Sequence, residues 1–246
     1  LDYLRRDSFY TGVTEGNIGS ARIIKMLNVV DDSLVVEHKG IYSLENYLTT
    51  RRLMYWQVYL HRTCVAYEKV LVNMLNRAKE LIRKGQEVFA SPALYYFLTN
   101  EVDANWFATH PETLTYYGEL DDSDIWSAMK AWKHHQDKIL STLATDMLDR
   151  HIFKVEVTEE MVEKTRIETI AKAISAQMEI SIDDAKRYMM SMNTISKDMY
   201  NVEDDTIAIL YKDGTIRDIS EASELLNVQL LSKKIRKYYL CYQRFE

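Results

Sequence analysis

The sequence predicts a mainly α-helical protein with a small C-terminal α+β lobe. Its 246 residues include only two prolines and seven glycines, the residues least compatible with a helix interior. The stretch from Ser43 to Lys84 contains neither of them. After His151 the sequence changes to short runs of alternating apolar and polar residues, which are typical of strands. We therefore expect a helical body over residues 1–150 and an α+β lobe over residues 151–246.

The opening segment, LDYLRRDSFYTG, is expected to be helical. A period of about 3.6 residues puts Tyr3 and Asp7 on one face and pairs Asp2 with Arg6 on a neighbouring face. The face with Tyr3 and Asp7 is a candidate ligand surface, and a solvated helix with an ion pair is the alternative. Ser20 is expected to cap the next helix at its N-terminus.

The stretch from Ser43 to Lys84 is expected to form one helix of about 60 Å, which Gly85 ends. Its later half predicts a buried seam, made by Tyr67, Leu71, Met74, Ala78 and Leu81. In its earlier half Arg51, Tyr55 and Tyr59 recur every four residues and so share one side of the helix. Arginine suits phosphate oxygens, and we expect the tyrosines to suit sugars and bases.

A second long helix is expected to begin near residues 122–124 and to carry Trp126, Met129 and Leu140, with its aromatic side chains in the core. The C-terminal elements are expected to be a strand, a helix, a hairpin that turns at Asp213-Gly214, and a final strand, over residues 152–157, 158–177, 206–220 and 237–243.

Composition restricts the classes of function. The net charge of −6 argues against a general nucleic-acid binder, and the basic run from Ser232 to Lys237 is better explained as a solvated helix face. Cys64 and Cys241 lie far apart in sequence, which indicates reduced, buried thiols and a cytoplasmic location rather than a disulfide framework. No apolar run approaches the roughly 20 residues needed to span a bilayer, so we expect no membrane partner.

The segments LDYLRRDSFYTG and TTRRLMYWQVYLHR, followed far downstream by RHIFKVEV, resemble the HD-domain deoxynucleotide triphosphohydrolases. The resemblance implies a helical HD-type body with long helices, a divalent metal, and hydrolysis of a deoxynucleoside triphosphate to deoxynucleoside and triphosphate. The family's metal site uses a histidine, a His-Asp doublet and a later aspartate. No histidine of this chain precedes an aspartate; the six are His38, His61, His110, His134, His135 and His151. We therefore expect the C-terminal part of a larger enzyme, with the catalytic and metal-binding residues outside this chain.

The resemblance also implies roles for single residues. It places Tyr3 near the phosphates and the sugar, and makes Asp7 the acceptor of the sugar 3′-hydroxyl. Arg51 matches a phosphate-binding arginine. Tyr59 matches a tyrosine that lies against the deoxyribose where a 2′-hydroxyl would need room. Tyr55, the fifth expected substrate-binding residue, stands where a close relative has histidine.

A second nucleotide site is implied by five basic residues that fall at or near the family's activator pockets between subunits. They are Arg22, Lys39, Arg62, Arg150 and Lys154. We accordingly expect a homo-oligomer that binds a deoxynucleotide substrate and an activator nucleotide, with ordinary surface charges as the alternative explanation. Two other functions stay open: an HD hydrolase of a different nucleotide or phosphoester, and a non-catalytic nucleotide-sensing oligomerisation module.

Overall fold

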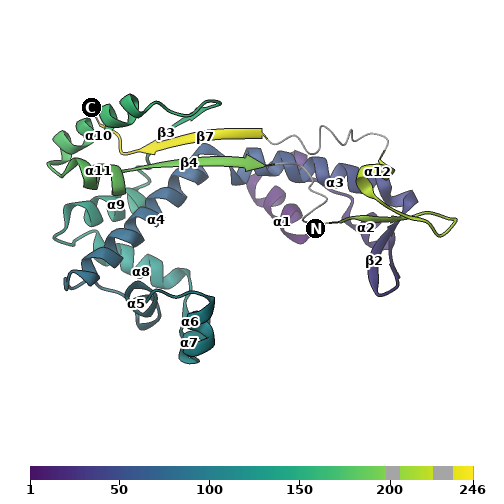
Figure 1. Cartoon of the computed structure of the whole chain (residues 1–246), viewed down its shortest axis with the longest axis horizontal. Coiled ribbons are helices and arrows are strands. Elements are labelled where there is room, and N and C mark those ends of the chain that lie inside the picture. Colours follow the sequence, from purple (N-terminus) through teal and green to yellow (C-terminus); the bar gives the residue numbers. More distant parts are fainter. Residues whose placement is uncertain (198–205, 224–234, 246) are drawn as a thin grey trace. The chain divides into compact units, whose positions relative to one another are not determined.

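The computed structural model describes residues 1–197, 206–223 and 235–245 (Figure 1). Helices dominate and the strands form two small sheets, which confirms the predicted fold class. The chain forms two compact units. Unit 1 comprises Leu1–Cys64 and Thr194–Lys237, and unit 2 comprises Val65–Asn193 and Tyr238–Glu246. These units are not separated at residue 150, where we expected the helical body to meet the α+β lobe. That domain boundary stays a prediction.

Unit 1 combines the N-terminal helices with a four-stranded sheet. Its elements are α1 (Asp2–Thr11), a 3-10 turn (Thr14–Gly16), α2 (Ser20–Lys25), β1 (Leu27–Val30), β2 (Ser33–Glu37), a second 3-10 turn (His38–Gly40), α3 (Ile41–Met54), a π-helical segment (Tyr55–Tyr59), β5 (Ala208–Leu210), β6 (Ile216–Asp218) and α12 (Ile219–Ala222). The expected opening helix is confirmed, and it ends at Gly12, whose φ of 71° is left-handed.

The sheet of unit 1 joins segments that are distant in sequence. Its strand order is β1-β2-β5-β6, and β2 runs parallel to β5, with Val36 opposite Ile209. The β5–β6 hairpin confirms the expected turn at Asp213-Gly214. The β1–β2 hairpin was not predicted, although Asp31 and Asp32 both have the positive φ that a type I′ turn requires.

Unit 2 contains a longer series of helices and a three-stranded sheet of order β3-β7-β4. Its elements are α4 (Arg62–Arg83), α5 (Pro92–Thr99), α6 (Ala104–Thr109), α7 (Glu112–Glu119), α8 (Asp122–Trp132), α9 (Lys138–Asp149), β3 (Lys154–Thr158), α10 (Lys164–Met178), α11 (Ile182–Tyr188), β4 (Met190–Lys197) and β7 (Ile235–Tyr242); the ends of α4, β4 and β7 extend into unit 1. The expected seam of α4 is buried at Met74, Ala78 and Leu81, whereas Tyr67 and Leu71 are half-buried.

The expectation of a single helix from Ser43 to Lys84 is wrong. Helix α3 ends at Met54, a π-helical segment covers Tyr55–Tyr59, and α4 begins at Arg62. The amide of Leu60 donates to the carbonyl of Tyr55 at 2.7 Å, which is the i to i+5 bond of a π-helix. This wider turn ends the first helix although the sequence has neither glycine nor proline there.

The second long helix is also divided. Helix α8 ends at Trp132, and Asp137 then caps α9 by accepting a hydrogen bond from the Leu140 amide at 2.8 Å. Trp126 is 51% exposed, so its expected place in the core is wrong, whereas Trp132 is buried.

Three smaller expectations need correction. Ser20 is the first helical residue of α2, and Gly19 occupies the cap position. Helix α10 begins at Lys164 instead of residue 158, because Thr158 ends strand β3. Both cysteines are free thiols, and Cys241 is buried as expected, but Cys64 is exposed.

Two further sequence features can be located. Residues 232–234 of the basic run lie outside the described residues. The expected helix face is wrong for residues 235–237, which belong to strand β7, and the Lys237 ammonium lies 4.5 Å from the centroid of the Trp56 ring. No helix in the described ranges combines the length and apolar character that crossing a bilayer requires.

Candidate functional site

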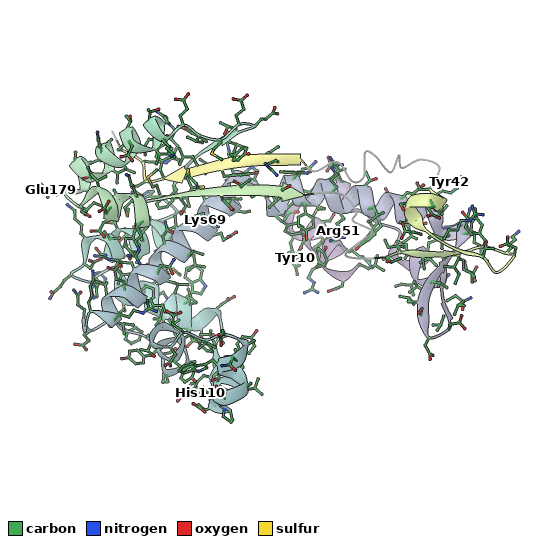
Figure 2. The ribbon with its side chains drawn as sticks, viewed as in Figure 1. Tyr10, Tyr42, Arg51, Lys69, His110 and Glu179 are labelled. Atoms are coloured by element: carbon green, nitrogen blue, oxygen red, sulfur yellow. The ribbon has the colours of Figure 1, made fainter. Side chains whose placement is uncertain are left out.

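Helices α1 and α3, with the π-helical segment, bring together the five residues expected to bind substrate. Leu4 of α1 and Met54 at the end of α3 are fully buried in one small apolar cluster with Ile18, and Tyr59 packs against this cluster. Because Leu4 is anchored, its helix presents Tyr3 and Asp7 toward the π-helical segment. Arg51 lies one turn before that segment, on α3 (Figure 2).

The contacts within this group are specific. The Tyr59 hydroxyl donates to Asp7 Oδ2 at 2.5 Å, although the two residues are 52 positions apart. The ring centroid of Tyr59 lies 6.2 Å from that of Tyr3 and 5.2 Å from that of Tyr55. The guanidinium carbon of Arg51 lies 5.8 Å from the centroid of the Tyr55 ring. The structure therefore gathers Tyr3, Asp7, Arg51, Tyr55 and Tyr59 into one cluster, which we call the tyrosine cluster.

Two phenols of the tyrosine cluster, those of Tyr3 and Tyr59, stay protonated at neutral pH. Burial raises the pKa of Tyr59, and the hydrogen bond to Asp7 raises it further. Burial also raises the pKa of Tyr3, as do the neighbouring phenols Tyr55 and Tyr47, while the charge of Arg51 opposes them. A protonated phenol donates a hydrogen bond and does not act as a base. The cluster thus offers one guanidinium, one carboxylate and three phenolic hydroxyls, a set suited to binding a phosphorylated polyol.

The expected activator residues are divided between the units. Arg22, Lys39 and Arg62 belong to unit 1, whereas Arg150 and Lys154 belong to unit 2, and all five are exposed. Arg22 donates to the Lys39 carbonyl at 3.3 Å, so the structure brings these two residues together. The Lys39 ammonium pairs with Glu37 at 2.8 Å.

Lys39 also lines a hollow of about 550 Å³ in unit 1, which sequence reasoning did not find. The turn after β2 and the end of β5 form its walls, and the parallel pairing of Glu37 with Leu210 brings these walls together. The His38 ring lies against the Tyr211 ring, with centroids 4.5 Å apart and planes tilted by 35°. No local sequence signal predicts this site, because the pairing strands lie more than 170 residues apart.

Metal ligands were expected to lie outside this chain. Among the residues that the structure describes, no group of three or more His, Cys, Asp or Glu side chains could hold a metal ion. The described residues therefore do not supply a complete ligand set for a catalytic metal by themselves.

Comparison with known proteins gives one family match and several relatives. The family described as HD associated region matches residues 18–95, a span that contains Arg51, Tyr55 and Tyr59 but not the α1 side of the tyrosine cluster. The uncharacterized protein YwfO of Bacillus subtilis is 30% identical over 250 residues, which cover 98% of this chain and 54% of YwfO. The chain thus spans about half the length of this curated relative.

Two solved structures are similar over almost the whole chain. A phosphohydrolase from Bacteroides thetaiotaomicron matches with a TM-score of 0.91 and 59% identity, over 99% of this chain and 60% of its own. A hypothetical protein from Aquifex aeolicus matches with a TM-score of 0.61 and 23% identity, over 99% of this chain and 53% of its own, which shows a shared fold alone. The chain is thus similar to an HD associated region over residues 18–95 and to a phosphohydrolase over almost its whole length.

Proposed function

We propose that this chain is part of a metal-dependent HD phosphohydrolase that hydrolyses deoxynucleoside triphosphates to deoxynucleoside and inorganic triphosphate. The observation that carries the proposal is the tyrosine cluster, in which Tyr59 and Asp7 are joined by a hydrogen bond beside Arg51. The HD associated region over residues 18–95 and the similarity to a phosphohydrolase support the reaction class.

Three members of the cluster have a task in this proposal. Arg51 binds the phosphates through charge-assisted hydrogen bonds. Asp7, oriented by the Tyr59 hydroxyl on Oδ2, accepts the sugar 3′-hydroxyl on Oδ1. The Tyr59 ring, held by the same bond, occupies the space that a 2′-hydroxyl would need, so a ribonucleotide is rejected sterically. A divalent metal, held by residues outside this chain, would polarise the phosphate that water attacks.

Substitutions at Tyr59 in the whole enzyme test this proposal. In Tyr59→Ala the ratio of kcat/KM for a deoxynucleotide to that for the ribonucleotide of the same base should fall about tenfold or more. In Tyr59→Phe the ring stays and the bond to Asp7 is lost. The deoxynucleotide rate should then fall roughly tenfold, because a hydrogen bond to a charged group contributes about 1.5 to 3 kcal/mol, while the ratio changes less.

Tyr10 provides the matched control, because it lies on the same helix α1 but is 79% exposed (Figure 2). Tyr10→Ala should leave both rates unchanged. A deoxy-to-ribo ratio that is unaffected by Tyr59→Ala, or that changes equally in Tyr10→Ala, would refute the proposed role of Tyr59. Activity restricted to another nucleotide or phosphoester would instead favour a different HD hydrolase.

We further infer an activator nucleotide at the hollow beside Lys39, in a protein that assembles as a homo-oligomer. The rings of His38 and Tyr211 and the ammonium groups of Lys39 and Lys212 line this hollow and offer contacts for a base and its phosphates. Two carboxylates, Glu37 and Asp213, line it as well, and Glu37 pairs with Lys39. If phosphates bind between subunits, the nucleotide must favour assembly, and dilution must weaken nucleotide binding.

Light scattering with and without deoxynucleotides tests this inference. Lys39→Ala should lessen nucleotide-dependent assembly, and a monomer under all conditions would contradict it. Assembly and nucleotide binding by the whole protein without any hydrolysis would favour the non-catalytic nucleotide-sensing module.

A further inference from the structure

Unit 2 contains a polar hollow of about 310 Å³ that shares no residue with the tyrosine cluster or with the expected activator set. One face of α4 forms its floor, the segment after α5 contributes Glu101, and the C-terminal end of α11 contributes Arg187 and Tyr188. Its volume lies at the small end of ligand pockets, which range from about 300 to 1,000 Å³. A ligand for this hollow must therefore be small.

Two cations of the hollow repel each other. Lys79 and Arg83 stand four residues apart on α4, where like charges destabilise a helix. Burial lowers the pKa of Lys79, and the charge of Arg83 lowers it further. A third cation, Arg187, lines the same hollow. Its guanidinium lies 3.6 Å from Glu80, a carboxylate that also lines the hollow and is paired with Arg77 and Lys84. An anion placed among these three groups would offset both the burial and the repulsion.

Glu101 shows where such an anion fits. Its carboxylate pairs with both Lys79, at 3.5 Å, and Arg83. The Glu101 side chain is nevertheless 75% exposed, so it can turn toward solvent at little cost. A free anion could therefore take the place of the Glu101 carboxylate beside Lys79 and Arg83.

A buried hydroxyl adds a second, independent observation. Tyr188 is fully buried, and its ring lies 5.0 Å from the guanidinium carbon of Arg77 and 5.2 Å from that of Arg187. Its hydroxyl has no hydrogen-bond partner in the part of the chain that the structure describes. A buried hydroxyl without a partner is costly, and buried polar groups in native proteins are almost always satisfied.

We propose that this hollow binds a small phosphate-class anion. Lys79, Arg83 and Arg187 neutralise its charge, the Tyr188 hydroxyl donates to one of its oxygens, and Glu101 turns outward when it binds. The site is independent of the proposed hydrolase activity, because none of its residues belongs to the tyrosine cluster.

Calorimetric titration of the full chain with pyrophosphate, at an ionic strength kept constant with chloride, tests the proposal. The double variant Lys79→Ala, Arg83→Ala should weaken binding at least tenfold. Tyr188→Phe should weaken binding several-fold without lowering the midpoint of thermal unfolding, because the removed hydroxyl has no partner among the described residues of the free protein. Glu101→Gln should strengthen binding several-fold, because it removes the competing carboxylate.

Lys138→Ala is the matched control, because it breaks an exposed ion pair with Glu179 in the same unit. It should bind pyrophosphate like the unchanged chain. Equal binding by the double variant and the control, weaker binding by Glu101→Gln, or no binding by the unchanged chain would each overturn the proposal. Titration with a nucleoside diphosphate separates the sources of the phosphate: an affinity equal to that for pyrophosphate indicates a free anion, and a higher one indicates that the base contributes.

Discussion

Replacing Arg77 by alanine should strongly destabilise unit 2. The Arg77 side chain is 10% exposed and donates to both carboxylate oxygens of Asp137, at 3.1 and 2.6 Å. It also donates to Asp184 at 3.4 Å and pairs with Glu80 at 3.6 Å. The side chains of Asp137 and Glu80 are only 14% and 17% exposed, and truncation would leave their carboxylates without this cation. Breaking a buried pair in this way costs about 3 to 5 kcal/mol.

The pKa of Asp137 gives the sign of the pH dependence. Burial raises this pKa, but the hydrogen bonds from Arg77 and from the Leu140 amide outweigh burial, so the pKa of the folded state lies below its ordinary value. A lowered pKa means that the contribution of Asp137 to stability is present above its unfolded pKa and is lost as the pH falls through the folded pKa. The loss of stability in Arg77→Ala should therefore be largest near neutral pH and should shrink in acid.

Urea denaturation followed by tryptophan fluorescence measures this change, because Trp132 is buried in unit 2. Lys138→Ala, at the exposed pair with Glu179, should change the free energy of unfolding by no more than about 1 kcal/mol. Adding Asp137→Asn to Arg77→Ala should recover part of the loss, because asparagine still caps α9 and carries no charge. A cost below about 1 kcal/mol for Arg77→Ala would refute the claim that this ion pair joins α4 to α9.

Three other predictions concern single sites. Gly16→Ala should destabilise unit 1 by about 1 to 3 kcal/mol in urea denaturation, because its methyl group would meet side-chain atoms of α1 and α3 at 2.3 to 2.9 Å, whereas a methyl group at Gly19 meets nothing within 4 Å. Burial raises the pKa of Asp146 to about 6, so the charged carboxylate destabilises the folded state above that pH. Asp146→Asn should therefore raise the free energy of unfolding at pH 7.5 by up to about 3 kcal/mol, and the free energy of unfolding should decrease less between pH 4 and 6 than in the unchanged chain. Iodoacetamide at pH 8 should modify Cys64, which is exposed, and spare Cys241, because burial raises its pKa to about 11; peptide mass spectrometry that found equal modification would contradict this.

Local periodicity predicted the elements whose structure depends on neighbouring residues. The opening helix, the buried seam of α4 and the turn at Asp213-Gly214 follow from spacing and turn chemistry. The break after Tyr59 could not be predicted in this way, because it results from an i to i+5 backbone bond and not from a helix-breaking residue. The parallel pairing of β2 with β5 joins distant segments, so no window of sequence contains it.

The candidate site was predictable to a similar degree. The four-residue spacing of Arg51, Tyr55 and Tyr59 gave their shared side directly, although the last turn is π-helical. That Tyr3 and Asp7 lie against them was implied only by the family resemblance. The spacing within each helix cannot indicate which faces of two helices meet. The raised pKa values of Tyr3 and Tyr59 likewise depend on burial, which the sequence does not give.

The geometry of the tyrosine cluster depends on one buried contact. Leu4 and Met54 are both fully buried in the same apolar cluster. Leu4 lies between Tyr3 and Asp7 in the sequence, and Met54 lies between Arg51 and Tyr55. The π-helical turn begins directly after Met54, so the position of this methionine fixes where Tyr55 and Tyr59 leave the helix. Leu4 fixes α1 in the same way, and the Tyr59 to Asp7 bond then joins two segments whose backbones are already anchored. Core packing thus orders the candidate site before any ligand arrives, which lowers the entropic cost of binding.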